Sequence, residues 1–239
     1  MKTDKNNDIK GIMIIDKPLN ITSMDVIRYL RKITNIRKIG HAGTLDPLAT
    51  GVLIVALGKA TKRINELMGL KKKYKTTIDL SAFSTTDDME GEKTKVKIKK
   101  IPTREEIDKI IKKNFTGQIE QTPPIYSAIK IKGKRAHQLA REGKEIKMKS
   151  RIITIDRIRI RDYQWPYLKL KIKCSKGTYI RSLGKDIGTA LGVGGYLTKL
   201  RRTSIGEFKI KRSIQLNQLN SKNWKNYLLN TDIKNIYNK

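Results

Sequence analysis

The stretch GHAGTLDPLATGVLIVAL, residues 40–57, joins an irregular loop to an apolar run. Three glycines and a proline fix an irregular backbone over residues 40–51, because glycine adopts conformations closed to other residues and proline fixes its own φ. The run VLIVAL at 52–57 is typical of a buried strand. His41 and Asp46 are the titratable side chains of the loop. Such loops often present functional groups from a rigid scaffold, although an Asp before a proline is also typical of a simple turn.

Strands and single helices alternate around this loop. Four further segments have strand composition or alternation: residues 12–15, 74–80, 152–160 and 168–174. Four segments have helical spacing of apolar residues, two of them behind capping residues: about residues 22–33, 60–67, 103–111 and 179–191. No internal repeat is present. The order predicts an α+β or mixed-sheet fold rather than a doubly wound one.

The chain is strongly basic. It holds 53 Lys and Arg against 22 Asp and Glu, a net charge of +31 at pH 7. Such an excess holds a protein against polyanions through counterion release. Lysine, isoleucine and asparagine are all abundant, however, as they are when a whole proteome drifts toward A/T-rich codons. Charge therefore favours nucleic-acid binding without choosing between DNA, RNA and compositional bias.

The residue inventory excludes several kinds of site. The single cysteine, Cys174, permits no internal disulfide and no cysteine-based zinc site, and its alternating surroundings indicate a small core residue. The two histidines, His41 and His137, form no metal-binding pair, so no metal is expected. The sequence holds no phosphate-binding loop and no nucleophilic serine elbow. Chemistry by a carboxylate without a cofactor remains.

Targeting signals are also missing from the sequence. No window is apolar for long enough to span a membrane. The first ten residues, MKTDKNNDIK, lack the apolar stretch of a signal peptide. We therefore expect a cytoplasmic protein with no membrane partner.

A second group of candidate residues lies at KGTYIRSL, residues 176–183. Tyr179 offers an aromatic face and a hydroxyl near the expected start of a helix. Arg181 offers a fixed cationic fork that suits a carboxylate or a phosphate. A half-buried tyrosine and a surface arginine would explain the same pattern without any function.

The loop at residues 40–53 resembles the signature loop of the TruB family of pseudouridine synthases. Other segments resemble further family motifs, in family order from about residue 11 to 208. They are DKP and TS within residues 16–23, KY at 73–74 with the acidic pair at 87–88, TPPIYSAIK at 122–130, GTYIRSL at 177–183 and LRRT at 200–203. A chance match of six ordered motifs is very improbable.

The resemblance implies both fold and reaction. The family's catalytic domain has a mixed, mainly antiparallel central sheet flanked by helices, with an inserted segment that grips RNA. Its bacterial tRNA enzymes isomerise uridine 55 of the T-loop to pseudouridine and need no cofactor or metal. The implied partner is therefore the T-stem-loop of tRNA. No obligate protein partner is implied, and a monomer is the family default.

The resemblance also assigns catalytic roles by position. Asp46 corresponds to the catalytic carboxylate. Arg181 is expected to pair with Asp46 and keep it ionised and aimed. Tyr179 is expected near the proton that leaves C5 of the base.

The remaining site residues are implied to bind the substrate. The target base has to leave its stack before a protein group reaches it, and Tyr74 is expected to stack on the flipped uracil. His41 is expected to brace the space that the base vacates. Lys17, Pro18 and Leu200 are expected to line the pocket.

The domain organisation follows from the same matches. Residues 11–212 are expected to form the catalytic domain, with the insertion at about 100–150. A disordered tail at 1–10 and a short helical tail at 213–239 are expected to flank it. Bacterial members usually carry a C-terminal RNA-binding domain of the PUA type, and no full second domain is expected here.

Two smaller departures from the family pattern concern single positions. Leu80-Ser81 stands where the family usually has Leu-Gly. His137 replaces a common tyrosine in the inserted segment, where it is expected to alter RNA contacts and leave the chemistry unchanged.

Three alternatives remain beside this interpretation. The main one is a non-catalytic RNA-binding or tRNA-folding protein on the same scaffold, which predicts a degenerate active loop. A guide-RNA-dependent relative would need the C-terminal domain. A carboxylate-dependent hydrolase would need a second acid near the first, and the matched motifs supply an arginine instead.

Overall fold

A computed structural model describes residues 9–127, 129–131, 133–142, 146 and 148–230. The chain forms two compact units, residues 1–74 with 200–239 and residues 75–199. Strands β4 (Lys72–Asp79) and β12 (Tyr196–Ile205) contribute residues to both units. The first unit holds the loop with Asp46, and the second holds Tyr179 and Arg181.

The strands of the first unit surround β3. These strands are β1 (Lys10–Lys17), β2 (Ile39–His41), β3 (Ala49–Gly58), β13 (Phe208–Lys209) and β14 (Ile214–Gln215). β1 and β2 pair antiparallel with β3, whereas β12 pairs parallel with it. β14 pairs parallel with the other edge of β1, and β13 pairs antiparallel with β12. The loop with Asp46 therefore connects two adjacent strands, β2 and β3.

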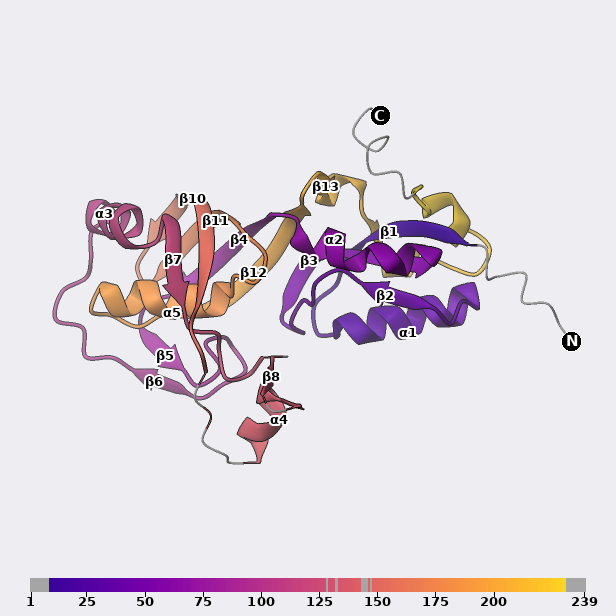
Figure 1. Cartoon of the computed structure of the whole chain (residues 1–239). Helices are drawn as coiled ribbons and strands as arrows, with labels where there is room; N and C mark the ends of the chain where they lie inside the picture. Colours follow the sequence, from indigo (N-terminus) through magenta and orange to yellow (C-terminus); the bar gives the residue numbers. More distant parts are fainter. Residues whose placement is uncertain (1–8, 128, 132, 143–145, 147, 231–239) are drawn as a thin grey trace, which may run out of the picture. The chain divides into compact units, whose positions relative to one another are not determined.

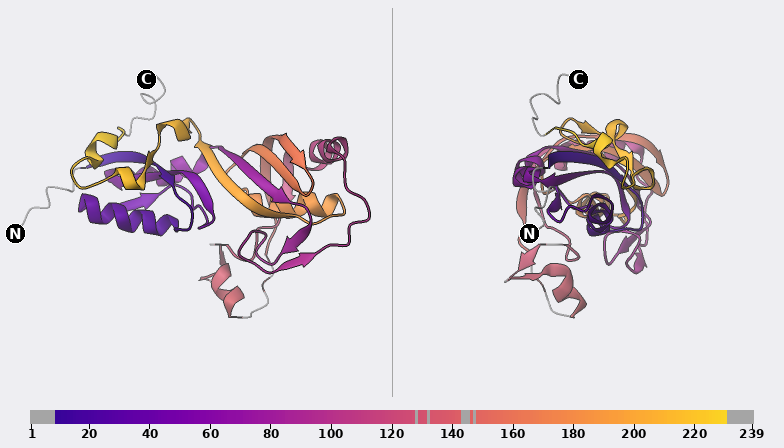
Figure 2. Two further views of the ribbon diagram at one scale, coloured as in Figure 1. Left: turned by 180° about the vertical axis from the view of Figure 1, so that it is seen from behind. Right: turned by 90° about the vertical axis from the view of Figure 1, so that its right-hand side faces the viewer.

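Helix α1 (Ser23–Thr34) covers one side of these strands (Figure 2). It begins where the side chain of Thr22 accepts a hydrogen bond from the backbone amide of Asp25, and the carboxylate of Asp25 accepts one from the backbone amide of Thr22. This capping box satisfies two amides of the first helical turn. Thr22 is the N-cap, and the side chain of Ser23 instead contacts the loop at Leu45.

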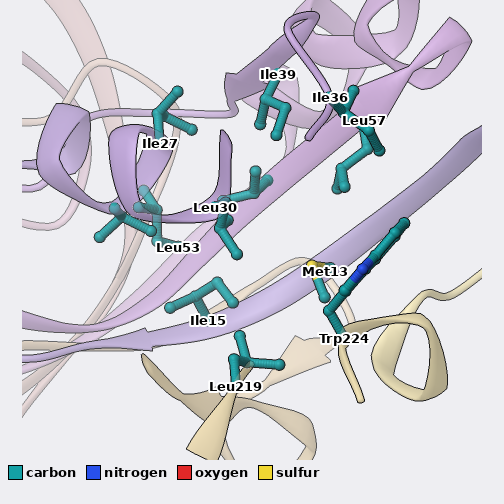
Figure 3. Packing of buried hydrophobic residues seen from close by; sticks show 12 residues of the cluster. Met13, Ile15, Ile27, Leu30, Ile36, Ile39, Leu53, Leu57, Leu219 and Trp224 are labelled. Carbon is teal, nitrogen blue, oxygen red and sulfur yellow. The ribbon is translucent and has the colours of Figure 1, made fainter. Parts of the chain in front are cut away.

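The apolar face of α1 packs into a buried cluster with β1, β3 and the C-terminal segment. Leu30, Leu53 and Leu57 meet Met13 and Ile15 at its centre (Figure 3). Leu219 and Trp224, from the C-terminal segment, close the cluster. The base of the loop therefore rests on a closely packed core, which resists deformation.

The C-terminal segment differs from the prediction of one amphipathic helix. Its regular structure is two short 3₁₀ helices, η3 (Leu216–Gln218) and η4 (Trp224–Tyr227). Asn220 accepts hydrogen bonds from the backbone of residues 222 and 223, which stabilises a turn between them. Side chains of this type compete with helix formation. The end of the predicted tail, residues 231–239, and most of the predicted N-terminal tail, residues 1–8, lie outside the described residues.

Short helices complete the first unit. The predicted helix at 60–67 is a 3₁₀ turn, η1 (Lys59–Arg63), followed by α2 (Ile64–Gly69). Another 3₁₀ turn, η2 (Ile210–Arg212), follows β13. Gly58, at the junction of β3 and η1, has φ near 57°, a conformation that glycine adopts without strain.

The second unit is built on a sheet in which β4 lies between β12 and β11, followed by β10 and β7. Its strands are β7 (Gly117–Gln121), β10 (Arg151–Gln164) and β11 (Tyr167–Cys174). β10 pairs antiparallel with both of its neighbours. Cys174 is fully buried, as predicted for a core residue. The predicted α+β class with a mixed, mainly antiparallel sheet is confirmed.

Two longer helices pack in this unit. Helix α3 (Arg104–Asn114) starts at a capping box of Thr103 and Glu106, as predicted, and contacts β10 and α5. Helix α5 (Ile180–Ala190) begins directly after Tyr179. Gly184 of α5 lies against Ile78 of β4, which places this helix on the sheet.

The region predicted as an RNA-gripping insertion, about 100–150, therefore contributes α3 and β7 to the packed unit. Its remainder holds β8 (Lys130–Ile131), β9 (Lys134–Arg135) and α4 (Ala136–Arg141). The side chain of His137 lies outside the described residues. A small sheet of β5 (Ala82–Ser84) and β6 (Lys93–Lys95) frames the acidic turn at 84–91. The RNA contact of the insertion stays a prediction.

Candidate active site

Asp46 occupies a tight turn at the centre of the loop between β2 and β3. Its carbonyl oxygen accepts a hydrogen bond of 3.0 Å from the amide of Ala49. Its side chain is partly exposed, whereas the flanking Leu45 is buried. The geometry thus presents a carboxylate from a turn whose neighbours anchor it in the protein.

Two side chains from distant segments hold the first half of this loop. Ser23 Oγ donates to the carbonyl of Leu45 at 3.1 Å and accepts from its amide at 2.9 Å. Arg202 donates to the carbonyls of Gly43 at 2.9 Å and Thr44 at 3.3 Å. Both residues lie within the matched motifs, but a hydrogen bond to a backbone group leaves no signature in the sequence of its partner, so neither role was predictable.

Lys17 supports the second half of the loop through a hydrogen bond to the carbonyl of Pro47. It is fully buried, and its Nζ donates to the carbonyls of Pro18 at 2.8 Å, Ile21 at 2.7 Å and Pro47 at 3.3 Å. Burial lowers the pKa of Lys17 to about 8, while the negative charge of Asp46 opposes this shift. The structure therefore makes Lys17 a support of the loop that lies within electrostatic reach of Asp46.

This buried amine makes stability depend on pH in a defined direction. The unfolded chain holds the Lys17 proton up to about pH 10.5, whereas the folded chain releases it near pH 8. Between those values the unfolded state binds more protons, so rising pH stabilises the fold by up to about 3 kcal/mol through this residue. We expect wild-type protein to gain stability relative to Lys17→Met from pH 8 to 10.5, measured by denaturant unfolding. Parallel stability curves for the two proteins would contradict this expectation.

His41 ends strand β2 at the start of the loop. Burial lowers its pKa, and the positive charge of Arg202 lowers that pKa further. The imidazole is therefore neutral at pH 7. Its Nδ1 is buried and has no hydrogen-bond partner among the described residues.

The other predicted binding residues of the first unit lie on or directly after strands β12, β1 and β4. Leu200 pairs in register with Ala49, directly after the turn of Asp46. Pro18 is exposed at the end of β1. Tyr74 on β4 is 8% exposed. The contacts of Tyr74 and Pro18 with a base stay predictions.

Arg181 is buried in the second unit, in the first turn of α5. It donates to the carbonyls of Thr86 at 3.0 Å and Tyr126 at 2.8 Å, and it lies 3.5 Å from a carboxylate oxygen of Asp88. Arg181 is therefore buried, and the alternative prediction of a surface arginine is wrong. Its pairing with Asp46 stays a prediction. Asp88 was foreseen only as one of two acids in a matched motif.

Tyr179 is held through its backbone and its ring. The side chain of Gln121 accepts from the amide of Tyr179 at 2.8 Å and donates to its carbonyl at 3.0 Å. The guanidinium of Arg151 lies 4.9 Å from the centre of the tyrosine ring and donates to the carbonyl of Gly177. Sequence reasoning missed both supporting residues, which come from strands β7 and β10.

The described residues include neither a metal-binding group of side chains nor a membrane-spanning helix. Within the described residues no group of three or more His, Cys, Asp and Glu side chains could hold a metal ion. In that same part of the chain, no helix is long and apolar enough to cross a membrane. What the loop offers is one partly exposed carboxylate on an anchored backbone, beside a buried cation and a neutral imidazole.

The family models and the relatives that match this chain agree on one family. A family model described as TruB family pseudouridylate synthase (N terminal domain) matches residues 31–180. A second, described as tRNA pseudouridylate synthase B C-terminal domain, matches residues 181–236. The tRNA pseudouridine synthase B of Clostridium tetani is 43% identical over 92% of this chain and 76% of its own length. That of Clostridium novyi is 45% identical over 94% of this chain and 77% of its own length.

A solved structure described as a Cbf5-Nop10-Gar1 complex shares the fold. It is 33% identical with a TM-score of 0.68, and the match covers 87% of this chain and 53% of the other. This chain therefore spans about half the length of its structural relative. The ordered motifs, the anchored carboxylate loop and these matches agree, and the chain belongs to the TruB family of pseudouridylate synthases.

Proposed function

We propose that this protein is an isomerase that converts uridine 55 in the T-stem-loop of tRNA to pseudouridine, with Asp46 as its catalytic carboxylate. The observation that carries the proposal is the loop itself. Its backbone is anchored at residues 43, 44, 45 and 47, and it presents Asp46 partly exposed. Relatives named tRNA pseudouridine synthase B over most of this chain supply the substrate class.

The reaction is an internal rearrangement that needs no oxidant or reductant. The bond from N1 of uracil to C1′ of ribose breaks, the base rotates, and C5 bonds to C1′. C5 then loses its proton, and N1 gains one. Asp46 acts either at the base or at the sugar, and both routes need it ionised. The balance of the reaction requires no cofactor.

For the other residues we propose the roles that their match to the family motifs implies. Tyr74 stacks on the flipped uracil, because an unpaired base binds an aromatic face. Tyr179 lies near the C5 proton, and Arg181 pairs with Asp46 in the substrate complex. Such charge-assisted pairs orient as well as stabilise a carboxylate. His41 is neutral and braces the space that the base vacates.

Charge on the hairpin of β10 and β11 supports RNA binding. Arg157 lies directly across from Lys173, and Arg159 across from Lys171. Like charges opposite each other destabilise a sheet. Arg157, Arg159 and Lys171 are exposed on neighbouring strands, which fits a polyanionic partner. The hairpin also holds acids, and Asp156 and Asp162 pair with Lys173 and Lys169.

Binding is therefore expected to depend steeply on salt. With six to ten phosphate contacts, affinity for tRNA falls roughly 10³- to 10⁵-fold between 50 and 200 mM salt. Replacing Arg157, Arg159 and Lys171 with glutamine should lower the slope of log affinity against log salt by about 2 to 3. The matched control replaces Lys109, Lys112 and Lys113 of α3, removing the same charge. Equal slopes for the two triple variants would contradict a role for the hairpin.

The main alternative is a non-catalytic RNA-binding or tRNA-folding protein. It would tolerate a missing carboxylate, whereas Asp46, Tyr74, Tyr179 and Arg181 are all present. We propose further that the enzyme acts as a monomer in the cytoplasm, without an obligate protein partner. Sedimentation of the purified chain with and without tRNA tests its oligomeric state.

Mapping pseudouridine in an unmodified tRNA transcript tests the function. The expected result is modification at position 55 by the purified protein alone, without added metal. A transcript with cytidine at that position is the control and should stay unmodified. Tight binding of the transcript without any pseudouridine would favour the non-catalytic alternative.

A further inference from the structure

Arg202 is a cation buried within the protein. Its side chain is 2% exposed, and it lies on β12 opposite Gly51 of β3. Its hydrogen-bond acceptors among the described residues are backbone carbonyls, which carry no full charge. Burying an arginine costs free energy unless its hydrogen bonds are well satisfied, and the guanidinium cannot lose its proton. The hydrogen bonds of Arg202 therefore have to offset this cost.

The contacts of Arg202 join the two ends of the loop. Nη2 and Nη1 donate to the carbonyls of Gly43 and Thr44 before Asp46, and Nε donates to the carbonyl of Val52 after it, at 2.7 Å. All three nitrogens of the planar fork are used. A lysine could not reproduce this, because its single ammonium group is a point donor on a flexible stem.

One glycine of the loop motif makes room for this arrangement, and a second adopts a backbone conformation that favours glycine. A Cβ on Gly51 would lie 2.2 Å from the carbonyl oxygen of Arg202. A Cβ on Gly43 would lie 3.7 Å from Nη1 of Arg202, and Gly43 has φ near 97°. The glycines that mark the loop in the sequence thus include one that the backbone of Arg202 requires directly.

Charge gives the arrangement a second consequence. Burial is the main cause that lowers the pKa of both Lys17 and His41, and the positive charge of Arg202 lowers each further, whereas Asp46 raises the pKa of Lys17. Lys17 therefore lies within electrostatic reach of Arg202 and Asp46, and His41 within reach of Arg202. Two buried cations support the loop that carries Asp46, which supplies a compensating negative charge. An ionised carboxylate is the form that the proposed reaction needs.

We propose that Arg202 is a positioning residue for catalysis, which fixes the carboxylate of Asp46 by tying the loop closed at both ends. The inference rests on the proposed role of Asp46. A carboxylate on an untied loop samples many orientations, and misplacement by about 1 Å costs on the order of 10²-fold in rate. Arg202 touches neither substrate nor reacting atoms in this role.

The test compares Arg202→Met and Arg202→Lys with wild type and with a core control, Leu57→Ala. Leu57 is fully buried in the cluster beside α1, where it lies opposite Gly11 of β1 and Ile39 of β2. Single-turnover rate and tRNA affinity are measured separately. We expect both Arg202 variants to lose roughly 10²-fold in rate with affinity within about threefold of wild type. The core control should lose stability and keep its rate.

A second measurement does not depend on activity. Hydrogen exchange at the amides of Leu45 and Ala49, which bond to Ser23 and Asp46, should accelerate in the Arg202 variants more than exchange in β1. If Arg202→Met does not fold, Arg202→Lys decides. Wild-type rates in either variant, or a rate loss matched by Leu57→Ala, would overturn the inference. Failure of wild type itself to form pseudouridine would instead overturn the proposed function.

Discussion

Asp46→Asn is expected to abolish pseudouridine formation, with a loss of about 10⁴-fold or more in single-turnover rate. The amide keeps the shape of the carboxylate and removes its negative charge and nucleophilicity. The loop should keep its conformation, because its anchors are backbone contacts of Ser23, Arg202 and Lys17. Binding of tRNA should stay within about threefold of wild type, since phosphate contacts dominate affinity.

The matched control for this variant is Asp162→Asn. Asp162 is an acid on β10 that pairs with Lys169 at 2.8 Å, and such solvent-screened surface pairs contribute little to stability. The same chemical change there should leave the rate unchanged. Pseudouridine mapping by chemical modification and primer extension gives both rates. Turnover by Asp46→Asn near that of the control would remove Asp46 from catalysis.

Gly51→Ala is expected to destabilise the fold by about 4 kcal/mol or more. Gly51 has φ near 103°. For a residue other than glycine, such a strained backbone conformation costs roughly 1–3 kcal/mol of free energy. Its new Cβ would also lie 2.2 Å from the carbonyl oxygen of Arg202, which belongs to rigid backbone. The overlap can be relieved only by separating β3 from β12, and such losses are exceptional for a single substitution.

Gly69→Ala serves as the control for Gly51→Ala. A Cβ on Gly69 meets nothing within 4 Å, and alanine favours the helical position that it occupies at the end of α2. Its stability should change by about 1 kcal/mol or less, measured by urea unfolding beside wild type. An equal loss in both variants would show that the close pairing of Gly51 with Arg202 does not limit stability.

Local interactions explain where sequence prediction of the fold succeeded. The starts of α1 and α3 were predictable because Thr22 with Asp25, and Thr103 with Glu106, form capping boxes within four residues. Prediction failed in the C-terminal segment, where helical spacing of apolar residues suggested one helix. Leu219 and Trp224 are buried there by long-range packing, which two 3₁₀ turns satisfy as well.

The residues of the candidate site also divide into those that contiguous motifs indicate and those that only the fold brings together. The sequence identified Asp46, His41, Tyr179 and Arg181 through motifs that are contiguous in the chain. The sequence could not choose between Asp87 and Asp88 as the motif's acidic residue, whereas the fold brings Asp88 within 3.5 Å of Arg181. Nor could it find Gln121, whose two bonds to Tyr179 join residues 58 positions apart.

The sequence by itself determined the α+β class, the main helices and strands, and the loop that carries Asp46, because those depend on local propensity and on contiguous motifs. Only the tertiary structure decided what holds that loop in place. Arg202 lies 159 positions from Gly43, and its acceptors are backbone carbonyls that every residue has. Such a contact follows from the parallel pairing of β12 with β3, which brings distant residues together without leaving a pattern in either segment.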